Sequence, residues 1–392
     1  MYISEPQKNI PVRGEYDVLV AGGGIAGVSA ALAAARQGAK TLLVEKQCIL
    51  GGLATAGLVT IYLPLCDGMG KQVSFGIAEE LLRLSMVYGP EARYPKPWIE
   101  GGTKEEKAHT RYMVQFNPHL YALEMEKLLL DTGVTILYDT TICNVLTNQD
   151  KVEYAILENK SGRGSYKVKS VVDATGDADL CKFAGEDTVN CSYNNKLSSW
   201  YYGLAEGKLN LFAFDIDNID GCPTKDIYTG LDGEQNSHMV QEAHRLMRTH
   251  YQKTVKDQPD FVPVTLPTML QIRMTRRVDG AYCLSDTEMH RYFEDSIGMI
   301  CDWRKRGPVY EIPFRTLYGK KIKNLICAGR CISVTDDMWE ISRVIPPCAV
   351  TGEAAGIAAA MTDDFASLDV AKLQQILRKN NVVIHENDLR ED

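Results

Sequence analysis

The sequence predicts an α/β fold built on a parallel sheet, with a second domain of α+β type. Three observations predict it. A short apolar strand at residues 16–21 runs directly into a glycine-rich turn and then into an alanine-rich helix. A strand–turn–strand pattern occupies the middle of the chain, and a long helix of small residues lies near its C-terminal end. The 392 residues are enough for two to three domains and a large buried core.

Composition excludes several classes of protein. Hydrophobic residues make up 45% of the chain and charged residues 24%, which is typical of globular domains and not of disordered, collagenous or coiled-coil proteins. The net charge is −8, and no block of Lys and Arg interrupts the sequence. Since nucleic acids are bound mainly through their phosphates, we expect no nucleic-acid partner.

Cysteine usage predicts a reduced, cytoplasmic protein without a metal. The eleven cysteines are scattered, odd in number and contain no CxxC pair. The closest pair is Cys327 and Cys331, and no second pair completes a metal site, so we expect none. Residues 18–35 carry no charge, but their four glycines divide them into a strand and a helix, so we expect no membrane span. Residues 1–17 lack the layout of a signal peptide.

The turn after the first strand has the residues of a dinucleotide-binding motif. Its sequence is Gly-Gly-Gly-Ile-Ala-Gly at residues 22–27. Gly22 permits the tight turn, Gly24 lets the backbone approach a pyrophosphate, and Gly27 lets the helix pack closely. Ile25 and Ala26 begin the helix, whose N-terminus favours negative charge. Glu45 ends the second strand, residues 41–44, and is placed to accept hydrogen bonds from a ribose diol.

The residues after Glu45 distinguish FAD from NAD. A glycine pair lies about six residues after Glu45 and is followed by small residues, where an NAD-binding domain would continue with another strand and helix. This loop resembles that of flavoproteins in the glutathione-reductase-like FAD superfamily, where it runs along the pyrophosphate. The resemblance implies a Rossmann-like FAD-binding domain of glutathione-reductase type, a parallel sheet with a β-meander. It also implies FAD contacts at Lys46, Gly51, Gly52, Leu53, Ala54 and Thr55.

The middle of the chain supplies further positions of this resemblance. We expect a helix at 117–131, a strand at 134–137 and a hairpin of residues 152–157 and 166–172. Ile142 matches the position that meets the adenine. The tetrad Ala174, Thr175, Gly176 and Asp177 resembles the second FAD-contact motif of the superfamily. We interpret Asp177 and Asp179 as turn and N-cap residues of a helix that begins near Leu180.

The C-terminal third contains the stretch that is most specific for this resemblance. Residues 324–330 form a strand that ends in Gly329 and Arg330, and residues 343–360 lead into a small-residue helix. We expect this helix to pack on the first strand–helix–strand unit, with its N-terminus near Thr351 and Gly352 directed at the flavin N1/O2 edge. The FAD positions predicted here are Gly329, Arg330, Gly352, Ala354 and Ala355.

Together these stretches resemble the bacterial FAD-dependent oxidoreductase family over nearly the whole chain. The motifs are those of residues 50–57, 173–180, 273–286, 324–333 and 343–360. A more distant similarity connects them with the flavoprotein subunits of fumarate reductase and succinate dehydrogenase. There is no second GxGxxG unit and no redox-active CxxC. The missing second unit predicts an enzyme without its own NAD(P)H domain, and the resemblance leaves the substrate open.

The resemblance suggests a discontinuous domain organisation. We expect residues 1–60, 117–190 and 310–365 to form the FAD-binding domain. Residues 61–116 and 191–309 form the substrate or cap domain, and residues 366–392 a terminal helix and tail. Flavin carries the redox chemistry itself, so the protein must supply placement and charge stabilisation. The catalytic candidates are Arg343, Arg330 and Arg273, with Arg276 and Arg277 as further clamps for a carboxylate.

Three functions remain open at this point. The first is an oxidoreductase that transfers a hydride between a small organic substrate and flavin N5. The second is an FAD-carrying electron-transfer subunit that depends on a redox partner protein. The third is a non-redox flavoprotein such as a hydratase or isomerase. A homo-oligomer is compatible with all three.

Overall fold

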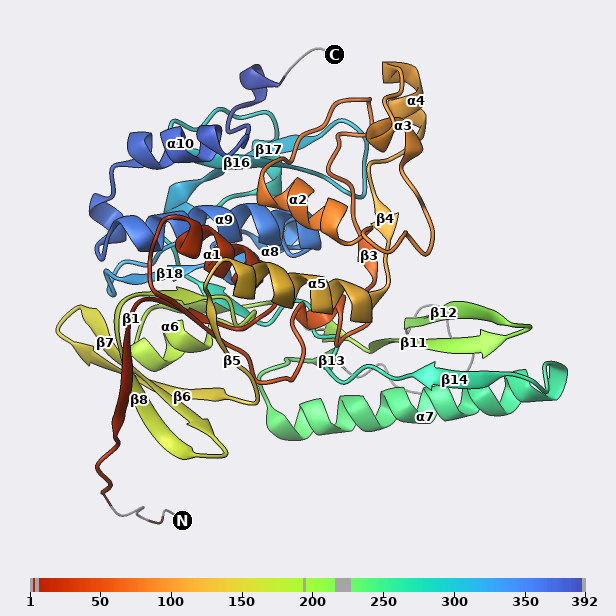
Figure 1. Ribbon diagram of the computed structural model, residues 1–392, viewed down its shortest axis with the longest axis horizontal. Coiled ribbons are helices and arrows are strands. Elements are labelled where there is room, and N and C mark those ends of the chain that lie inside the picture. The colour runs from red at the N-terminus through yellow and green to blue at the C-terminus, as the bar shows by residue number, and fades with distance from the viewer. Residues whose placement is uncertain (1–2, 4–6, 193–194, 216–226, 390–392) are drawn as a thin grey trace.

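A central sheet of seven strands organises the protein (Figure 1). The computed structural model describes residues 3, 7–192, 195–215 and 227–389. The strand order is β5–β2–β1–β8–β7–β6, with β18 also paired to β8. The strands are β1 (Val12–Ala21), β2 (Thr41–Val44), β5 (Thr135–Leu137), β6 (Thr141–Asn148), β7 (Lys151–Asn159), β8 (Gly162–Asp173) and β18 (Leu325–Cys327).

The parallel part of the sheet contains β5, β2, β1, β8 and β18. Its central strands are apolar on both faces, because helices or strands cover each side: residues 18–21 of β1 and all of β2 are buried. The antiparallel meander β6–β7–β8 extends the sheet at one end. The predicted α/β fold, a Rossmann-like parallel sheet with a β-meander, is confirmed.

Two helices of small residues pack against each other on one face of the sheet. They are α1 (Ile25–Arg36) and α9 (Ile345–Met361). A Cβ added to Gly352 would lie 2.3 Å from the carbonyl oxygen of Ala26, and one at Gly356 would lie 2.1 Å from that of Ala30. Glycine at these two positions therefore allows the helix backbones to approach closely.

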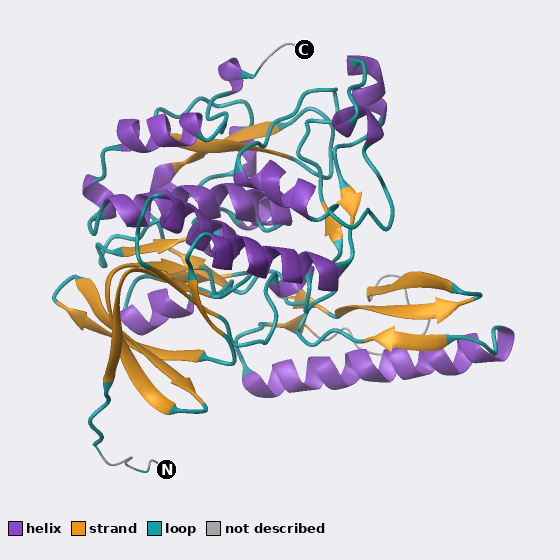
Figure 2. Cartoon of the chain, in the orientation of Figure 1, coloured by secondary structure: helices purple, strands orange, loops and turns teal. Residues whose placement is uncertain are grey.

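Further helices surround this pair (Figure 2). The helix α5 begins at an Asn117 cap, whose Oδ1 accepts hydrogen bonds from the amides of His119 and Leu120. Around α9 lie α2 and α10, together with the β16–β17 hairpin. These elements are α2 (Ile77–Leu84), α5 (Pro118–Asp131), α10 (Val370–Lys379), β16 (Ser296–Cys301) and β17 (Val309–Pro313).

A long helix and a three-stranded antiparallel sheet project from one side of the molecule (Figure 1). Tyr201, Met247 and Phe261 join the helix to the sheet through a small apolar cluster. The elements are α7 (Gly233–Asp257), β11 (Ser198–Ala205), β12 (Lys208–Asp215) and β14 (Val262–Thr265). All four lie in the range 191–309 predicted for the substrate domain.

The remaining elements are short. The helices are α3 (Lys96–Ile99), α4 (Lys104–His109), α6 (Asp179–Ala184) and α8 (Asp336–Ser342). The strands are β3 (Ile61–Tyr62), β4 (Val114–Gln115), β9 (Thr188–Asn190), β10 (Asn195–Lys196), β13 (Ile227–Tyr228) and β15 (Arg276–Val278). No single helix in the described ranges is both long enough and apolar enough to cross a membrane. The helices α8 and α9 meet the length and composition criteria only when they are taken together, and they are bent by 90° relative to each other.

The grouping of segments differs in part from the predicted domains. The helix α2, from the range 61–116, packs against α9, and so does β16, from the range 191–309. Both were expected in the cap. Apolar side chains such as Ile77, Leu81 and Ile297 account for the difference, because they belong to the same core cluster as the interior of α9. The domain boundaries themselves stay a prediction.

Candidate functional site

The main candidate site is a cavity at the carboxyl ends of the parallel strands, where ligands bind in open α/β sheets. Gly22 follows β1, Glu45 follows β2, Ala174 follows β8 and Ala328 follows β18, and all four line it. The cavity encloses about 1040 Å³, its open mouth included. Its lining comprises Gly22, Gly24, Ile25, Ala26, Val44, Glu45, Lys46, Gly51, Gly52, Leu53, Ala54, Thr140, Thr141, Ile142, Ala174, Thr175, Gly176, Asp179, Met269, Ala328, Gly329, Arg330, Arg343, Ile345 and Cys348.

The glycine turn exposes the N-terminus of α1 to this cavity. Gly22 has φ +94°, and a Cβ there would lie 2.6 Å from the carbonyl oxygen of Ala174. A Cβ on Gly24 would instead meet nothing within 4 Å, so the missing side chain leaves open space in front of the helix. The first turn of a helix has amides without intrahelical acceptors, and its dipole favours anions. The site is therefore shaped for a phosphate group.

Glu45 lies beside this turn and is almost fully buried. Its Oε2 accepts a hydrogen bond of 2.6 Å from the amide of Gly23, and its Oε1 one of 2.7 Å from that of Gln47. Burial raises the pKa of the Glu45 carboxyl, and the two amides partly counteract this increase.

The loop after β2 forms the opposite wall. The amide of Gly51 donates to the carbonyl of Gly23 at 2.8 Å, so the loop is bonded directly to the glycine turn. Gly51 and Gly52 have φ +102° and +56°, and a Cβ on Gly52 would come within 3.1 Å of the Gly24 Cα. Side chains at these two positions would narrow the space between the loop and the glycine turn, which explains why both residues are glycine.

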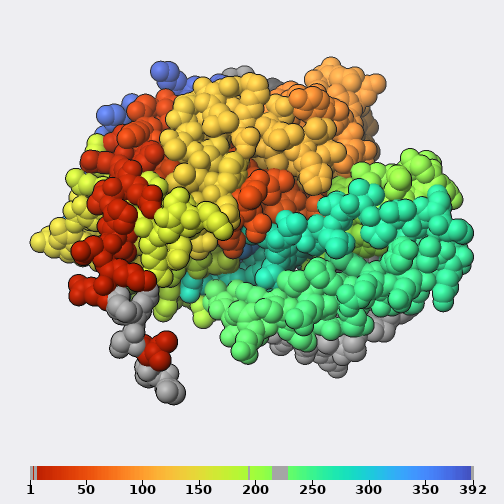
Figure 3. Space-filling view, turned by 60° about the horizontal axis from the view of Figure 1, so that its bottom comes forward, coloured from red at the N-terminus to blue at the C-terminus, as the bar shows by residue number. Residues whose placement is uncertain are grey.

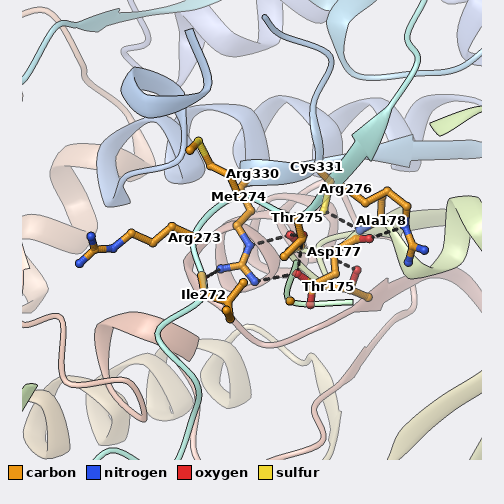
Figure 4. Close-up of polar contacts among 12 residues, drawn as sticks. Thr175, Asp177, Ala178, Ile272, Arg273, Met274, Thr275, Arg276, Arg330 and Cys331 are labelled. Atoms are coloured by element: carbon orange, nitrogen blue, oxygen red, sulfur yellow. Dashed lines mark hydrogen bonds and ion pairs between the residues drawn. The ribbon is translucent and has the colours of Figure 1, made fainter. Parts of the chain in front are cut away.

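Arg330 connects three segments around the cavity (Figure 4). Its Nε donates to the Gly176 carbonyl at 2.6 Å, its Nη1 to the Ile272 carbonyl at 2.7 Å, and its Nη2 to Asp177 at 3.0 Å. Asp177 also accepts from the Thr275 hydroxyl at 2.7 Å. All three guanidinium nitrogens have partners within the protein, so the geometry favours a positioning role for Arg330 over direct substrate binding.

The arginines at 276 and 277 are also held by the protein. Arg276 donates to the Asp177 carbonyl at 2.9 Å and to Asp179 at 2.7 Å. Burial raises the pKa of Asp179 to about 6, and the carboxylates of Asp173 and Asp177 contribute to this increase. Arg277 is buried, lies 5.9 Å from the ring centroid of Trp339, and does not line the cavity. Neither arginine is placed as the predicted substrate clamp.

Arg343 lines the far end of the cavity, with Met269, Ile345 and Cys348. It forms an ion pair with Glu340. Burial lowers the pKa of Arg343, and the positive charges of Arg273 and Arg330 lower it further. Asp177 and Glu340 offset part of the charge of Arg330 and Arg343, and the remaining positive charge in this poorly hydrated region favours binding of an anion.

Arg273, the third predicted catalytic arginine, does not line this cavity, but its charge acts on Arg343. Its amide is fixed by Asn195 Oδ1 at 2.9 Å, and its Nη2 donates to the Ser198 hydroxyl at 3.0 Å. Figure 4 shows its side chain directed away from the Arg330 network.

Six of the predicted cofactor positions are outside the cavity lining: Gly27, Thr55, Asp177, Gly352, Ala354 and Ala355. Gly27 packs on the Gly22 carbonyl, Thr55 donates to the Leu50 carbonyl, and Asp177 binds Arg330. The last three pack within the helix layer, because α9 begins at Ile345, six residues earlier than expected. The end of α9 near Ile345 and Cys348, and not Thr351, therefore borders the cavity.

Sequence reasoning did not assign seven lining residues to the site: Val44, Thr140, Thr141, Asp179, Met269, Ala328 and Ile345. Val44 and Ala328 directly adjoin predicted positions, so the strand ends could have indicated them. Ile345 precedes Pro346 and Pro347 at the start of α9, and proline at the first helical positions marks a helix N-terminus. Met269 lies in an irregular segment, and no local pattern indicates its place.

One buried group of ligand-type side chains lies beneath the cavity, within the described part of the chain: Asp173, Cys181 and Cys327. The two sulfur atoms are 3.3 Å apart. The Asp173 carboxylate already accepts hydrogen bonds from Thr175 and from the amide of Cys181. The N-cap position of α6 is Ala178, so neither Asp177 nor Asp179 caps this helix as expected, and the Asp173 carboxylate accepts the amide of Cys181 in its first turn instead.

Residues 17–196 and 190–377 match the sequence pattern of a family described as FAD dependent oxidoreductase. The chain belongs to this family. It is thus an oxidoreductase whose cofactor is FAD. The open helix N-terminus at Gly24 and the buried Glu45 carboxylate fit the pyrophosphate and ribose of such a cofactor.

Among characterised proteins, this FAD dependent oxidoreductase is similar to two groups of enzymes. It is 26% identical over 190 residues to the digeranylgeranylglycerophospholipid reductase of Picrophilus torridus, covering 48% of this chain and 46% of that protein. It is 28% identical over 229 residues to the tRNA uridine 5-carboxymethylaminomethyl modification enzyme MnmG of Lactococcus lactis, covering 55% and 33%. The chain spans less than half the length of these relatives.

Two solved structures are similar at lower identity. A geranylgeranyl bacteriochlorophyll reductase-like protein from Thermoplasma acidophilum is 15% identical and covers 94% of this chain and 82% of that one, with a TM-score of 0.46. The open conformation of a flavocytochrome c3 fumarate reductase is 13% identical and covers 89% and 78%, with a TM-score of 0.42.

Proposed function

We propose that the enzyme transfers a hydride between a carbon of a small organic substrate and N5 of FAD, without an NAD(P)H domain of its own. The observation that supports this proposal is the shape of the first cavity. It is continuous from the glycine turn at α1 to the arginine-rich end at Arg343, so one elongated cofactor and one substrate can lie end to end. Bound FAD supplies the electron transfer, and the protein supplies placement and charge.

The cofactor contacts follow from the lining. Ile25 and Ala26, at the N-terminus of α1, would hold the pyrophosphate, and Glu45 would accept hydrogen bonds from the ribose. Ile142 would border the adenine. The wall formed by residues 174–176 would contact the chain between pyrophosphate and flavin. Arg330 would keep this wall in place through its bonds to Gly176 and Ile272.

Arg343 and Arg273 would hold the substrate. The first is buried and lines the cavity; the second does not line it, but lies close enough for its charge to lower the pKa of Arg343. Guanidinium groups bind carboxylates with paired hydrogen bonds and keep their charge at all working pH values. We therefore infer that the substrate carries a carboxylate or a similar anion. An anion would also relieve the mutual repulsion of the arginines.

Anaerobic photoreduction of the purified flavoprotein tests this function. The reduced protein is mixed separately with air, with fumarate-like acceptors and with quinones, while the flavin spectrum is recorded. Fast discharge by an organic acceptor that carries a carboxylate is the expected result. Fast discharge only by quinones or by a partner protein would favour an electron-transfer subunit. Reduced flavin that no acceptor discharges would favour a non-redox role and contradict the proposal.

A further inference from the structure

A second cavity lies between α7 and the irregular segment that follows β14. Its volume is about 630 Å³, its open mouth included, and six of its eleven lining residues are apolar. Met239, Val240 and Ala243 contribute from α7, and Pro267 and Leu270 from the facing segment. Figure 3 shows α7 and this segment side by side along one face of the molecule. The proposed function leaves this space without a role.

The two cavities are adjacent. Met269 lines both of them, so this one side chain lies at their boundary. Methionine is unbranched and has three rotatable bonds, so its side chain can change conformation between the two cavities. A molecule bound at the arginine end of the first cavity would therefore reach the second by passing Met269.

The segment that carries Met269 is fixed to the cofactor loop. The amide of Thr268 donates to the Ala56 carbonyl at 2.9 Å, and Gln271 Nε2 donates to the Gly57 carbonyl at 2.5 Å. Both acceptors follow directly on residues 51–54, which line the first cavity. The boundary between the cavities thus has a defined position relative to the cofactor site.

A positive charge lies close to this boundary, on Arg273, which itself lines neither cavity. Arg273 Nη2 donates to the Ser198 hydroxyl at 3.0 Å, and that hydroxyl donates to Gln271 Oε1 at 3.2 Å. Ser198 and Gln271 line the second cavity, while the charge of Arg273 is felt by Arg343 in the first. From the first cavity to the second, the environment therefore changes from the arginines, through a polar boundary, to a chamber whose apolar side chains are accompanied by Ser199, His244 and Thr268.

We propose that the cavity along α7 is a substrate subsite and that the substrate is an amphipathic carboxylate. This proposal rests on the proposed function. It places the anionic head of the substrate at Arg343 and Arg273 and the apolar body in the space beyond Met269. The reacting carbon lies next to the head, in the first cavity. The apolar body is an alkyl, isoprenoid or aromatic group, which share the chemistry that this lining recognises.

Binding of straight-chain carboxylates of increasing length tests the subsite. The probes are acids of four to fourteen carbons, added to the FAD-loaded protein while the absorption of the bound flavin is monitored. Two variants are compared, V240W and Q241W. Val240 lines the cavity, whereas its neighbour Gln241 is exposed on the same helix, so the second variant controls for the added indole.

For the wild-type protein we expect affinity to rise about two- to fourfold per methylene until the chamber is filled. V240W should stop this rise at a shorter chain, with unchanged affinity for the four-carbon acid, and Q241W should follow the wild type. An affinity independent of chain length, or the same profile in V240W and wild type, would overturn the subsite. If short acids still perturb the flavin, the proposed function survives that result. If no acid perturbs it, both proposals fail.

Discussion

The backbone amide of Gly23 donates a hydrogen bond to the carboxylate of Glu45, with 2.6 Å between nitrogen and Oε2. This bond joins the turn after β1 to the end of β2. The other carboxylate oxygen accepts from the amide of Gln47 at 2.7 Å. An ionised carboxylate has about four acceptor positions, so two remain for the hydroxyl groups of a ribose. Glu45 therefore both fixes the glycine turn and is available to the cofactor.

Replacing Glu45 by alanine should weaken FAD binding by about 1–3 kcal/mol, because hydrogen bonds to a charged acceptor are lost from a buried site. Titration of the apoprotein with FAD, followed by flavin fluorescence, measures the dissociation constant. E15A is the control, since Glu15 is exposed on β1 and its 3.4 Å ion pair with Lys167 is a surface interaction. An unchanged dissociation constant for E45A would refute the ribose assignment.

The contact between α1 and α9 gives a second prediction. A Cβ on Gly356 would lie 2.1 Å from the Ala30 carbonyl oxygen, so G356A should lower the free energy of unfolding by about 1–3 kcal/mol, despite the better helix propensity of alanine. Urea unfolding of the FAD-loaded protein measures it. G233A is the matched control: its Cβ would meet nothing within 4 Å at the start of α7, so stability should be equal or slightly higher. Equal stability of G356A and wild type would show that the helices can separate without cost.

The sequence predicted the parts of the site in which a local pattern has one physical meaning. The strand, glycine turn and helix at residues 16–36 are such a case, and so is Glu45, because the end of a second parallel strand must lie beside the turn. Small residues in a helix can allow either a cofactor or a second helix to approach closely. We predicted that Gly352, Ala354 and Ala355 contact the cofactor, but in the structure they pack within the helix layer.

Other features depend on contacts between segments that are distant in the sequence. Arg330 was predicted as catalytic from its position after a strand, but its partners Gly176 and Ile272 are more than fifty residues away. Met269 occupies the boundary of two cavities because Thr268 and Gln271 bind the loop at residues 56–57. A pattern in a single sequence contains no signal for such pairings.

Arg343 and Arg330 should have separable effects. R343A should lower kcat/KM roughly 10- to 100-fold while FAD occupancy stays near that of the wild type, because the lost hydrogen bonds are to the substrate. R330A should lower FAD occupancy, because its guanidinium holds the Gly176 and Ile272 carbonyls at the cavity wall. The ratio of flavin to protein absorbance after purification gives occupancy, and turnover is expressed per bound flavin. Equal loss of occupancy and turnover in R343A would make that arginine structural.

Glu353 should make stability depend on pH. It is buried within α9, and its Oε2 accepts a hydrogen bond of 2.8 Å from the amide of Ile77 at the start of α2. Burial raises the pKa of the Glu353 carboxyl to about 7, from 4.5 when it is unperturbed. Between pH 4.5 and 7 the folded protein therefore keeps a proton that the unfolded chain releases. The contribution of Glu353 to the free energy of unfolding is greatest below this window, falls across it and stays constant above it.

The variant E353Q keeps an acceptor for the Ile77 amide but cannot ionise. At pH 5 its free energy of unfolding should be close to that of the wild type, and at pH 8 it should exceed it by on the order of 1–3 kcal/mol, since one pKa unit corresponds to about 1.4 kcal/mol. Urea unfolding of both proteins at the two pH values measures this difference. Because all other titrating groups are the same in the two proteins, their contributions cancel in the difference. E105Q, at an exposed position of α4, should show no such change. A constant difference between E353Q and wild type at pH 5 and 8 would mean that Glu353 ionises in the folded protein as readily as in the unfolded chain.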